Sequence, residues 1–451
     1  MQTFVPGASP ASSPTAGFKC NQCEQTYNGT GCIINGGVGR CGKDADVESL
    51  IETLIYGLKG MCAYAHHARR LGMVDEEVDA FVEEALFATI TNVNFDVPAL
   101  LDLVLECGKK NLRVMEMLDE GHRRRFGSPE VAEVTEGTFA GPGILVTGHD
   151  MLDLANLLDQ CAGTSVKVYT HGEMLPAHMY PKLRAHPSLA GHYGGAWQKQ
   201  KSEFEAFGGP IVATTNCVLI PKPSYAGRLF TLRAAAVPGG TRLDGKDFRP
   251  IIEKAKQCPP LPDSPKKKST VGFHHSVILS LAGKIVEAVK AGKVSRFFLI
   301  GGCDGFEPGR NYFSDYAQAA PKDSFILTLG CGKYRIRDFN YGLHPHLGIP
   351  RLLDMGQCND SFGAIQVAAA LAKAFNCSVN ELPLTIVLSW FEQKAVAVLL
   401  TLLALGVKGI TVGPNPPAFW SPNVLKLLQQ TYDIRVIGQD ARADLAAVMG
   451  R

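Results

Sequence analysis

The chain lacks the features that mark membrane-spanning, nucleic-acid-binding and secreted proteins. Its 451 residues contain no uninterrupted apolar run of the roughly 18 residues that a membrane-spanning helix needs. Lys and Arg number 45 against 43 Asp and Glu, so the formal charge of +2 provides no field for nucleic acid or an anionic membrane. The N-terminus does not show a basic segment followed by an apolar one, which a signal peptide requires, and we therefore expect no signal peptide.

The chain is also far too long to need a disulfide scaffold, although it contains 13 cysteines. An odd number of thiols favours a reducing compartment, where free thiols bind metals, carry redox chemistry or fill a core. We therefore expect a cytoplasmic protein. The alternative is an organelle of the plastid or mitochondrial type, if the small, polar, acid-free segment 1–19 is the remnant of a transit peptide rather than a disordered tail.

Two patterns of apolar residues divide the chain. From Val47 to Arg125 they recur at three- and four-residue steps, which predicts a small helical bundle. After Gly141, short β-rich runs alternate with helical patterns, which is typical of parallel α/β sheets. The segment CPPLPDSPKKKS, at 258–269, is predicted to be a linker between two such domains. We predict a disordered tail at 1–19, a cysteine-rich loop with a helical bundle at 20–141, and Rossmann-like, mainly parallel α/β domains at 142–262 and 263–451.

Residues that can bind a metal follow seven of the nine predicted strands. Ligands of an open parallel sheet lie beyond the carboxyl ends of its strands. Taken singly, each of these residues has an ordinary explanation as a buried cysteine, a helix cap or a surface carboxylate. Their shared position instead favours one common ligand shell. The runs ILVTG, VKVYTHG, PIVATTN, FFLIGG, FILTLG, RLLDMGQ and LTIVLSW deliver, in order, His149, Glu173, Cys217, Cys303, Cys331, Cys358 and Glu392.

The mixture of donor types indicates which metal centre they would hold. Thiolates suit iron–sulfur clusters, whereas carboxylates suit harder iron that carries oxygen. Four cysteines alone would favour a plain electron-transfer cluster, but one histidine and two glutamates exceed what such a cluster needs. The set therefore predicts a mixed iron–sulfur–oxygen cluster with an open coordination position for a substrate.

A second group of thiols precedes the first predicted helix. The loop KCNQCEQTYNGTGCIINGGVGRC contains Cys20, Cys23, Cys32 and Cys41 in a C-x2-C-x8-C-x8-C array. Four thiols in a short glycine-rich loop favour a metal cluster, with tetrahedral zinc as the alternative. A formal G-x-G-x-x-G match at 37–42 follows no predicted strand, so we reject a dinucleotide site there.

The motifs carry a family resemblance over nearly the whole chain, from about Cys20 to the C-terminus. The phrases VTGHDMLDL, VYTHGEMLPAH, ATTNCVLIPKPSY, GGCDG, LTLGCGKYR, LDMGQCNDS and LSWFEQKAV resemble those of the hybrid cluster protein, or hydroxylamine reductase, family. The resemblance implies a fold similar to carbon monoxide dehydrogenase. It also implies that the seven strand-end residues hold the hybrid iron–sulfur–oxygen cluster, that Cys303 is carried as a persulfide, and that the four N-terminal cysteines hold a conventional cubane.

Two departures from the family pattern stand out. The helical part before His149 is short, which resembles a subclass that has lost one of two helical bundles. The gap between Cys32 and Cys41 is longer than the family's usual spacing, which leaves both a [4Fe–4S] and a [2Fe–2S] cluster open for the N-terminal loop.

The resemblance implies an oxidoreductase that reduces small nitrogen oxides, nominally hydroxylamine to ammonia and water. Electrons would come from a donor protein such as a ferredoxin, a rubredoxin or a flavin/iron–sulfur reductase, and would enter at the N-terminal cluster. Lys394, two residues after Glu392, is a candidate proton relay together with that carboxylate, and its alternative role is that of an ordinary helix lysine.

Two other functions stay open at this point. One is reduction of nitric oxide to nitrous oxide at the same cluster. The other belongs to a different class: a redox-signalling protein that passes nitric oxide to thiols of partner proteins. Carbon monoxide chemistry is disfavoured, because two carboxylates suit oxo-bridged iron better than a nickel–sulfur centre.

Overall fold

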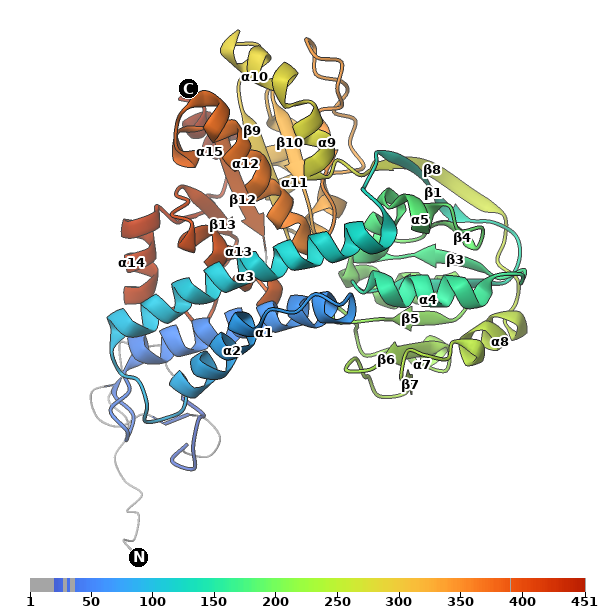
Figure 1. The fold of residues 1–451 in the computed structure, drawn as a ribbon, viewed down its shortest axis with the longest axis horizontal. Coiled ribbons are helices and arrows are strands. Elements are labelled where there is room, and N and C mark those ends of the chain that lie inside the picture. Colours follow the sequence, from blue (N-terminus) through green and yellow to red (C-terminus); the bar gives the residue numbers. More distant parts are fainter. Residues whose placement is uncertain (1–19, 27–30, 33–36, 390, 451) are drawn as a thin grey trace, which may run out of the picture.

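A layer of long helices lies across two α/β domains in the computed structural model (Figure 1). The structure describes residues 20–26, 31–32, 37–389 and 391–450, and the predicted tail at 1–19 lies outside them. Within these ranges, no helix is long and apolar enough to cross a membrane. The predicted fold class, a helical bundle followed by two mainly parallel α/β domains, is confirmed.

The helical layer consists of three helices that begin on aspartate caps. The carboxylates of Asp44, Asp75 and Asp96 accept hydrogen bonds from backbone N–H groups in the first turns, as N-cap residues do. Figure 1 shows the third helix running past both α/β domains. The helices are α1 (Ala45–Arg70), α2 (Glu76–Ala88) and α3 (Val97–Phe126).

The first α/β domain is built on an eight-stranded sheet in the order β7-β6-β5-β2-β3-β4-β1-β8. Neighbouring strands are parallel except for the antiparallel pair of β1 and β8. The strands are β1 (Ala132–Thr138), β2 (Gly143–Thr147), β3 (Lys167–Thr170), β4 (Leu189–His192), β5 (Ile211–Ala213), β6 (Leu229–Leu232), β7 (Thr241–Leu243) and β8 (Ser264–Val271). The helices are α4 (Met151–Cys161), η3 (Gly172–Met179), α5 (Pro181–Arg184), η4 (Trp197–Lys199), α6 (Gln200–Phe207), α7 (Pro223–Ala226) and α8 (Arg249–Gln257).

The second α/β domain is built on a six-stranded, fully parallel sheet in the order β11-β10-β9-β12-β13-β14. The strands are β9 (Phe297–Gly302), β10 (Phe325–Thr328), β11 (Leu352–Asp354), β12 (Leu384–Ser389), β13 (Ile410–Gly413) and β14 (Arg435–Val436). The helices are α9 (His275–Ser280), α10 (Ala282–Lys290), α11 (Tyr312–Ala319), η5 (Cys331–Arg335), η6 (Cys358–Asp360), α12 (Ser361–Phe375), η7 (Val379–Glu381), α13 (Gln393–Ala404), α14 (Pro422–Tyr432) and α15 (Ala441–Val448).

All nine apolar runs in the sequence form strands, but five strands were not predicted. The most telling is β8, because it occupies part of the segment expected to be a linker. Its residues are almost all exposed, so its sequence shows no apolar pattern. The strand is held in the sheet by backbone pairing with β1. Lys268 pairs with Glu133 across that edge, at 3.0 Å. Both β1 and β8 lie outside the predicted range 142–262, although they belong to its sheet.

The helical layer packs against the second α/β domain at very short range. Helices α1 and α3 both contact α13, the helix that follows Glu392. A methyl group at Gly60 of α1 would lie 2.1 Å from the carbonyl oxygen of Gln393, the first residue of α13. Only glycine permits this approach, so Gly60 sets the distance between α1 and the start of α13.

We expect Gly60→Ala to lower the thermal unfolding temperature, because the added methyl group would force the two helices apart at a cost of roughly 1–3 kcal/mol. The measurement is thermal unfolding followed by circular dichroism. Gly283 is the matched control: it lies in α10 with no atom within 4 Å of an added methyl group. There, alanine should stabilise the helix by about 0.5–1 kcal/mol. Equal effects of the two substitutions would contradict the packing argument.

Candidate metal centre

Three predicted ligands come from the first α/β domain, each just beyond a strand. His149 follows β2, Glu173 lies in the 3-10 helix η3 after β3, and Cys217 follows β5. His149 does not cap the next helix, because Asp150 is the N-cap of α4. His149 and Glu173 are buried, with relative exposures of 4% and 5%.

The other four predicted ligands come from the second α/β domain. Cys303 follows β9 directly, and Cys331 and Cys358 begin the 3-10 helices after β10 and β11. Glu392 is the N-cap residue of α13, after β12. The two sets meet because the carboxyl ends of the two sheets face each other: Gln357 donates from its side-chain amide to the backbone carbonyls of His149 (3.1 Å) and Glu173 (2.6 Å).

Local backbone conformation supports this placement at two positions. Gly302, before Cys303, has a φ of +119°, and a methyl group there would lie 2.0 Å from the carbonyl oxygen of Ser389. Cys217 itself has a φ of +65°, a left-handed conformation that costs a non-glycine residue roughly 1–2 kcal/mol. Strain of this kind persists where the surroundings hold the residue in place, and it is common at functional sites.

Distances between the predicted ligand atoms show that side chains of the two domains meet in one buried group, which we call the pocket. His149 Nε2 lies 3.9 Å from Glu173 Oε2, and the backbone N–H of Cys358 donates to the same carboxylate oxygen at 3.0 Å. The ligand atoms of His149, Glu173 and Cys358 all lie within 4.8 Å of one another. On the other side, Cys303 Sγ lies 3.7 Å from Glu392 Oε1.

Charge interactions connect the thiols of Cys217, Cys303 and Cys331 with the other predicted ligands. Burial raises the pKa of Cys358 to about 12 and also raises the pKa values of Cys217, Cys303 and Cys331. The charge of Glu392 adds to the raised pKa values of Cys217 and Cys303, and that of Glu173 to the raised pKa of Cys331. The structure therefore brings all seven predicted ligands into one mutually interacting set.

Lys394 lies in the same pocket, buried to 1% exposure on α13. Its charge lowers the pKa values of Cys217, Cys358 and Glu392 against the larger effect of burial. Its Nζ has no hydrogen-bond partner among the described residues and lies 5.4 Å from the ring centre of Tyr64. An ordinary surface lysine would be exposed, so its position favours a functional role.

Sequence reasoning missed several residues that contact this set, among them Gln357, Tyr64 and Thr215. The hydroxyl of Tyr64, on α1, donates to Cys358 Sγ at 3.0 Å. The hydroxyl of Thr215 lies 3.0 Å from His149 Nδ1, which orients that imidazole. Thr215 lies within the phrase ATTNCVLIPKPSY, two residues before Cys217, whereas Tyr64 lies in none of the quoted phrases. Tyr64 also precedes Cys358 by 294 residues, so nothing in the sequence links them.

The residues present fit an iron–sulfur–oxygen cluster. Glu173 Oε1, like Lys394 Nζ, is buried without a hydrogen-bond partner among the described residues, although buried polar atoms nearly always have one. Soft thiolates, an imidazole and hard carboxylates together match iron that carries both sulfur and oxygen. A single tetrahedral ion would use only four of the seven donors.

The N-terminal thiols lie far from this pocket. Cys20 and Cys32 are buried and adjacent, because the N–H of Cys32 donates to the carbonyl of Cys20 at 2.9 Å. Cys23 is exposed and Cys41 is half-buried. In the described part of the chain, these four thiols form no group of three within 4.8 Å. Their loop precedes α1, whereas Tyr64 lies near its other end, a separation of roughly 30 Å at 1.5 Å per residue.

The chain matches one family over almost its whole length. The Prismane/CO dehydrogenase family matches residues 18–102 and 96–445. The chain belongs to this family, that of the hybrid cluster proteins. It is 58% identical to a hydroxylamine reductase of Moorella thermoacetica over 431 residues, which cover 96% of this chain and all of the relative. A hydroxylamine reductase of Methanothermobacter thermautotrophicus is 46% identical with the same coverage.

A hydroxylamine reductase of Rhodospirillum rubrum is 53% identical over 90% of this chain but 73% of its own length. Family members therefore occur in two lengths, as expected if a shortened subclass exists. Solved structures confirm the fold: carbon monoxide dehydrogenase IV from Carboxydothermus hydrogenoformans has a TM-score of 0.77 at 15% identity, covering 96% of this chain and 92% of that one. The carbon monoxide dehydrogenase of Thermococcus sp. AM4 also has a TM-score of 0.77, at 16% identity over 96% of this chain and 90% of that one.

The 3-10 helix that carries Glu173 is buried along its whole length and contains a buried histidine. His178 Nε2 lies 3.0 Å from Thr170 Oγ1 on β3, and burial lowers the pKa of this histidine to about 4 from 6.5. Because the folded protein holds His178 neutral, its contribution to stability is complete above pH 6.5 and is lost as the pH falls toward 4.

We expect the stability of the wild-type protein to fall by about 3 kcal/mol from this residue alone between pH 6.5 and pH 4. In His178→Gln this share of the pH dependence should be absent, because the amide does not titrate. Urea unfolding at a series of pH values measures it, with the exposed His346→Gln as the control. The same pH dependence in His178→Gln and the wild type would contradict this assignment.

Proposed function

We propose that the pocket holds a hybrid iron–sulfur–oxygen cluster and that the enzyme reduces hydroxylamine to ammonia and water. The names of its relatives support an oxidoreductase that acts on a nitrogen compound, as the sequence predicted. The observation that carries the proposal is the meeting of soft and hard donors from two sheets in one pocket. The proposed ligands are His149, Glu173, Cys217, Cys303, Cys331, Cys358 and Glu392, with Cys303 carried as a persulfide.

The reaction defines what the pocket has to supply. Hydroxylamine takes up two electrons and two protons as its N–O bond breaks, which yields ammonia and water. When bound, the cluster would supply the electrons and a Lewis-acidic iron for the substrate. The protein would supply ligation, protons and exclusion of side reactions.

Lys394 is the residue we propose to hold a proton for this reaction. Its ammonium group is buried and unpaired among the described residues, on the same helix turn as the carboxylate of Glu392. The charge of Lys394 lowers the pKa of Glu392 against the larger effect of burial, so the two groups are near enough to influence each other's protonation. Lys394 Nζ lies 5.4 Å from the centre of the buried Tyr64 ring, so an aromatic side chain rather than solvent borders it on that side.

We propose that Cys20, Cys23, Cys32 and Cys41 hold the second cluster, of the [4Fe–4S] type with [2Fe–2S] as the alternative. Electrons would reach it from a donor protein such as a ferredoxin, a rubredoxin or a flavin/iron–sulfur reductase. The cytoplasm, where such donors are kept reduced, is the compartment we propose.

Reduction of nitric oxide to nitrous oxide is the second candidate, and an apolar cavity favours it. The cavity has a volume of about 210 Å³ and lies between the six-stranded sheet and helices α12 and α13. Its lining includes Gly301, Leu329 and Leu388, which lie two to four residues before Cys303, Cys331 and Glu392. Dry apolar cavities of this size bind apolar molecules, a class that includes nitric oxide but not hydroxylamine.

Steady-state turnover of both substrates with one electron donor decides between these two reactions. The physiological substrate should be reduced with the higher kcat/KM. Negligible reduction of both by a protein with its full iron content would overturn the proposed function.

We expect Glu392→Gln to retain the fold and the N-terminal cluster but to disturb the hybrid cluster, because an amide is a much poorer iron ligand than a carboxylate of the same shape. Hydroxylamine turnover should fall by roughly tenfold or more. The measurements are anaerobic EPR of the hybrid cluster and iron content. Glu253→Gln, an exposed position on α8, is the matched control. An unchanged hybrid-cluster signal in Glu392→Gln would count against this ligand.

Cys20→Ser should remove the N-terminal cluster and stop turnover with an external donor while leaving the hybrid-cluster EPR signal intact. The reason is that the two thiol groups lie at opposite ends of α1. Iron analysis and EPR of the same sample measure both centres. Loss of both signals in a folded variant would show that the two sites are not independent.

A further inference from the structure

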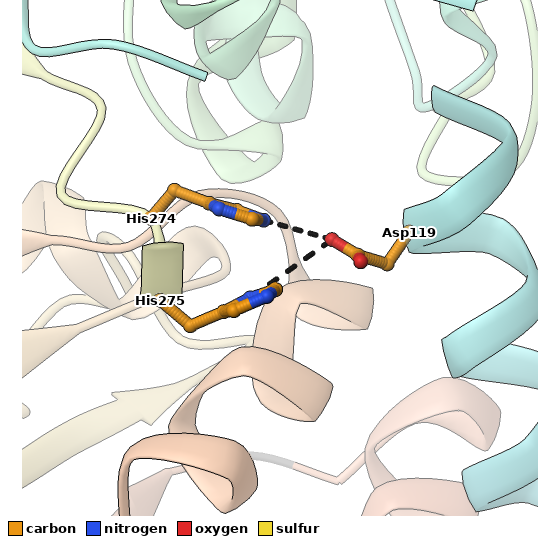
Figure 2. Close-up of side chains that lie close together, drawn as sticks. All are labelled: Asp119, His274 and His275. Carbon is orange, nitrogen blue, oxygen red and sulfur yellow. Dashed lines mark hydrogen bonds and ion pairs between the residues drawn. The ribbon is translucent and has the colours of Figure 1, made fainter. Parts of the chain in front are cut away.

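A second group of metal-binding side chains lies outside the pocket just described, where α3 meets the beginning of α9 (Figure 2). Asp119 projects from α3, and His274 and His275 open α9. Figure 2 shows both imidazoles directed at the carboxylate of Asp119 from the same side. Asp119 Oδ1 lies 2.8 Å from His274 Nε2 and 4.0 Å from His275 Nδ1.

These side chains are almost free of solvent. The relative exposures of the Asp119, His274 and His275 side chains are 4%, 1% and 12%. His275 Nδ1 is buried, and it has no hydrogen-bond partner among the described residues. Buried polar atoms nearly always form a hydrogen bond, yet His275 Nδ1 faces the Asp119 carboxylate without forming one. This nitrogen is therefore available to bind a metal ion.

We propose that Asp119, His274 and His275 bind one divalent first-row transition-metal ion, with zinc as the representative. Two imidazoles and one carboxylate suit zinc or iron(II), whereas magnesium and calcium prefer oxygen ligands. Donors that each lie about 2.1 Å from one ion are about 3.0–3.4 Å apart at right-angled to tetrahedral geometry. The observed separations of 2.8 and 4.0 Å lie on either side of that range, so His274 would have to move slightly away from the carboxylate and His275 toward it.

Neighbouring groups orient two of the three ligands. The other oxygen of Asp119 accepts a hydrogen bond from Arg123 Nε at 2.9 Å, which leaves Oδ1 for an ion. His274 Nδ1 lies 2.8 Å from the hydroxyl of Ser276 and 3.3 Å from its backbone N–H. Nδ1 accepts from that N–H as the N-cap of α9, so in the metal-free protein Nε2 carries the proton and donates to Asp119 Oδ1. Metal binding at Nε2 would move this proton to Nδ1, where the Ser276 hydroxyl can accept it. Support of this kind is usual for histidine ligands.

The position of the site indicates a structural role. Asp119 belongs to the helical layer, whereas the two histidines begin the second α/β domain. Gly363 of α12 packs directly against His275, since a methyl group there would lie 2.9 Å from its Nδ1. The ion would thus join α3 to the beginning of α9, packed against α12 and near η6, the short helix that carries Cys358. With so little exposure, a substrate has no access, and the inference does not depend on the proposed function.

The test is zinc binding by the holoprotein after removal of loosely held metal with a chelator. Equilibrium dialysis against zinc followed by elemental analysis should find about one more zinc per chain in the wild type than in Asp119→Asn or His275→Gln, at equal iron content. Ser276→Ala should bind this zinc about 10- to 100-fold more weakly. The exposed His346→Gln is the control and should bind as the wild type does.

Zinc binding that is equal in the wild type, Asp119→Asn and His275→Gln would overturn the site, as would a wild type that retains no zinc. If both variants fail to fold, anomalous diffraction from zinc-soaked crystals of the wild type replaces them. A zinc peak between Asp119 and the two histidines supports the proposal, and zinc bound elsewhere only would refute it.

Discussion

Four thiols and two carboxylates share a pocket in which burial opposes negative charge on every one of them. Burial is the largest cause of the raised pKa of each of these acids, and the same desolvation lowers the pKa of His149. Charges of neighbouring acids add to the effect for Cys217, Cys303 and Cys331. The single positive charge of Lys394 only partly offsets this effect. Further positive charge in the pocket would stabilise the ionised, metal-binding forms of these acids, so the composition of the site favours a cationic centre.

The arrangement of the two sheets explains how so many acidic side chains come together. In a parallel sheet, successive strands end at one edge, and each strand end can present one side chain to that edge. Two sheets with facing edges double the number of such side chains around one point. The bridging hydrogen bonds of Gln357 to the loops of His149 and Glu173 hold the edges together without using a ligand atom.

The helical layer completes the pocket from a third direction. Helix α1 brings the hydroxyl of Tyr64 to the sulfur of Cys358, and the contact of Gly60 with Gln393 keeps α1 against the residues that flank Glu392 and Lys394. A hydrogen bond to a cluster sulfur is one of the means by which proteins set a reduction potential. If Cys358 holds the proposed cluster, helix α1 would therefore tune its reduction potential as well as support the pocket.

The sequence could predict the parts of this arrangement that depend on short-range patterns. Fully buried strands appear as apolar runs, and the rule for strand ends then identifies residues such as Cys331 and Glu392 without any knowledge of distances. The exposed strand β8 was missed because backbone pairing with β1 holds it, and such pairing leaves no apolar pattern. Tyr64 and Gln357 were missed because their roles depend on contacts between domains far apart in the chain.

Under the proposed function, the apolar cavity distinguishes the two candidate substrates better than the residues of the pocket do. Hydroxylamine is polar, so its transfer from water into the apolar cavity beside the six-stranded sheet is unfavourable. Nitric oxide would be concentrated by the same lining, because transfer of an apolar molecule from water is favourable. Both proposed reactions consume protons, so both would use the proposed proton-holding group of Lys394 beside Glu392. Under this proposal, a polar residue at Leu388 in the cavity lining would affect one substrate, whereas a change at Lys394 would affect both.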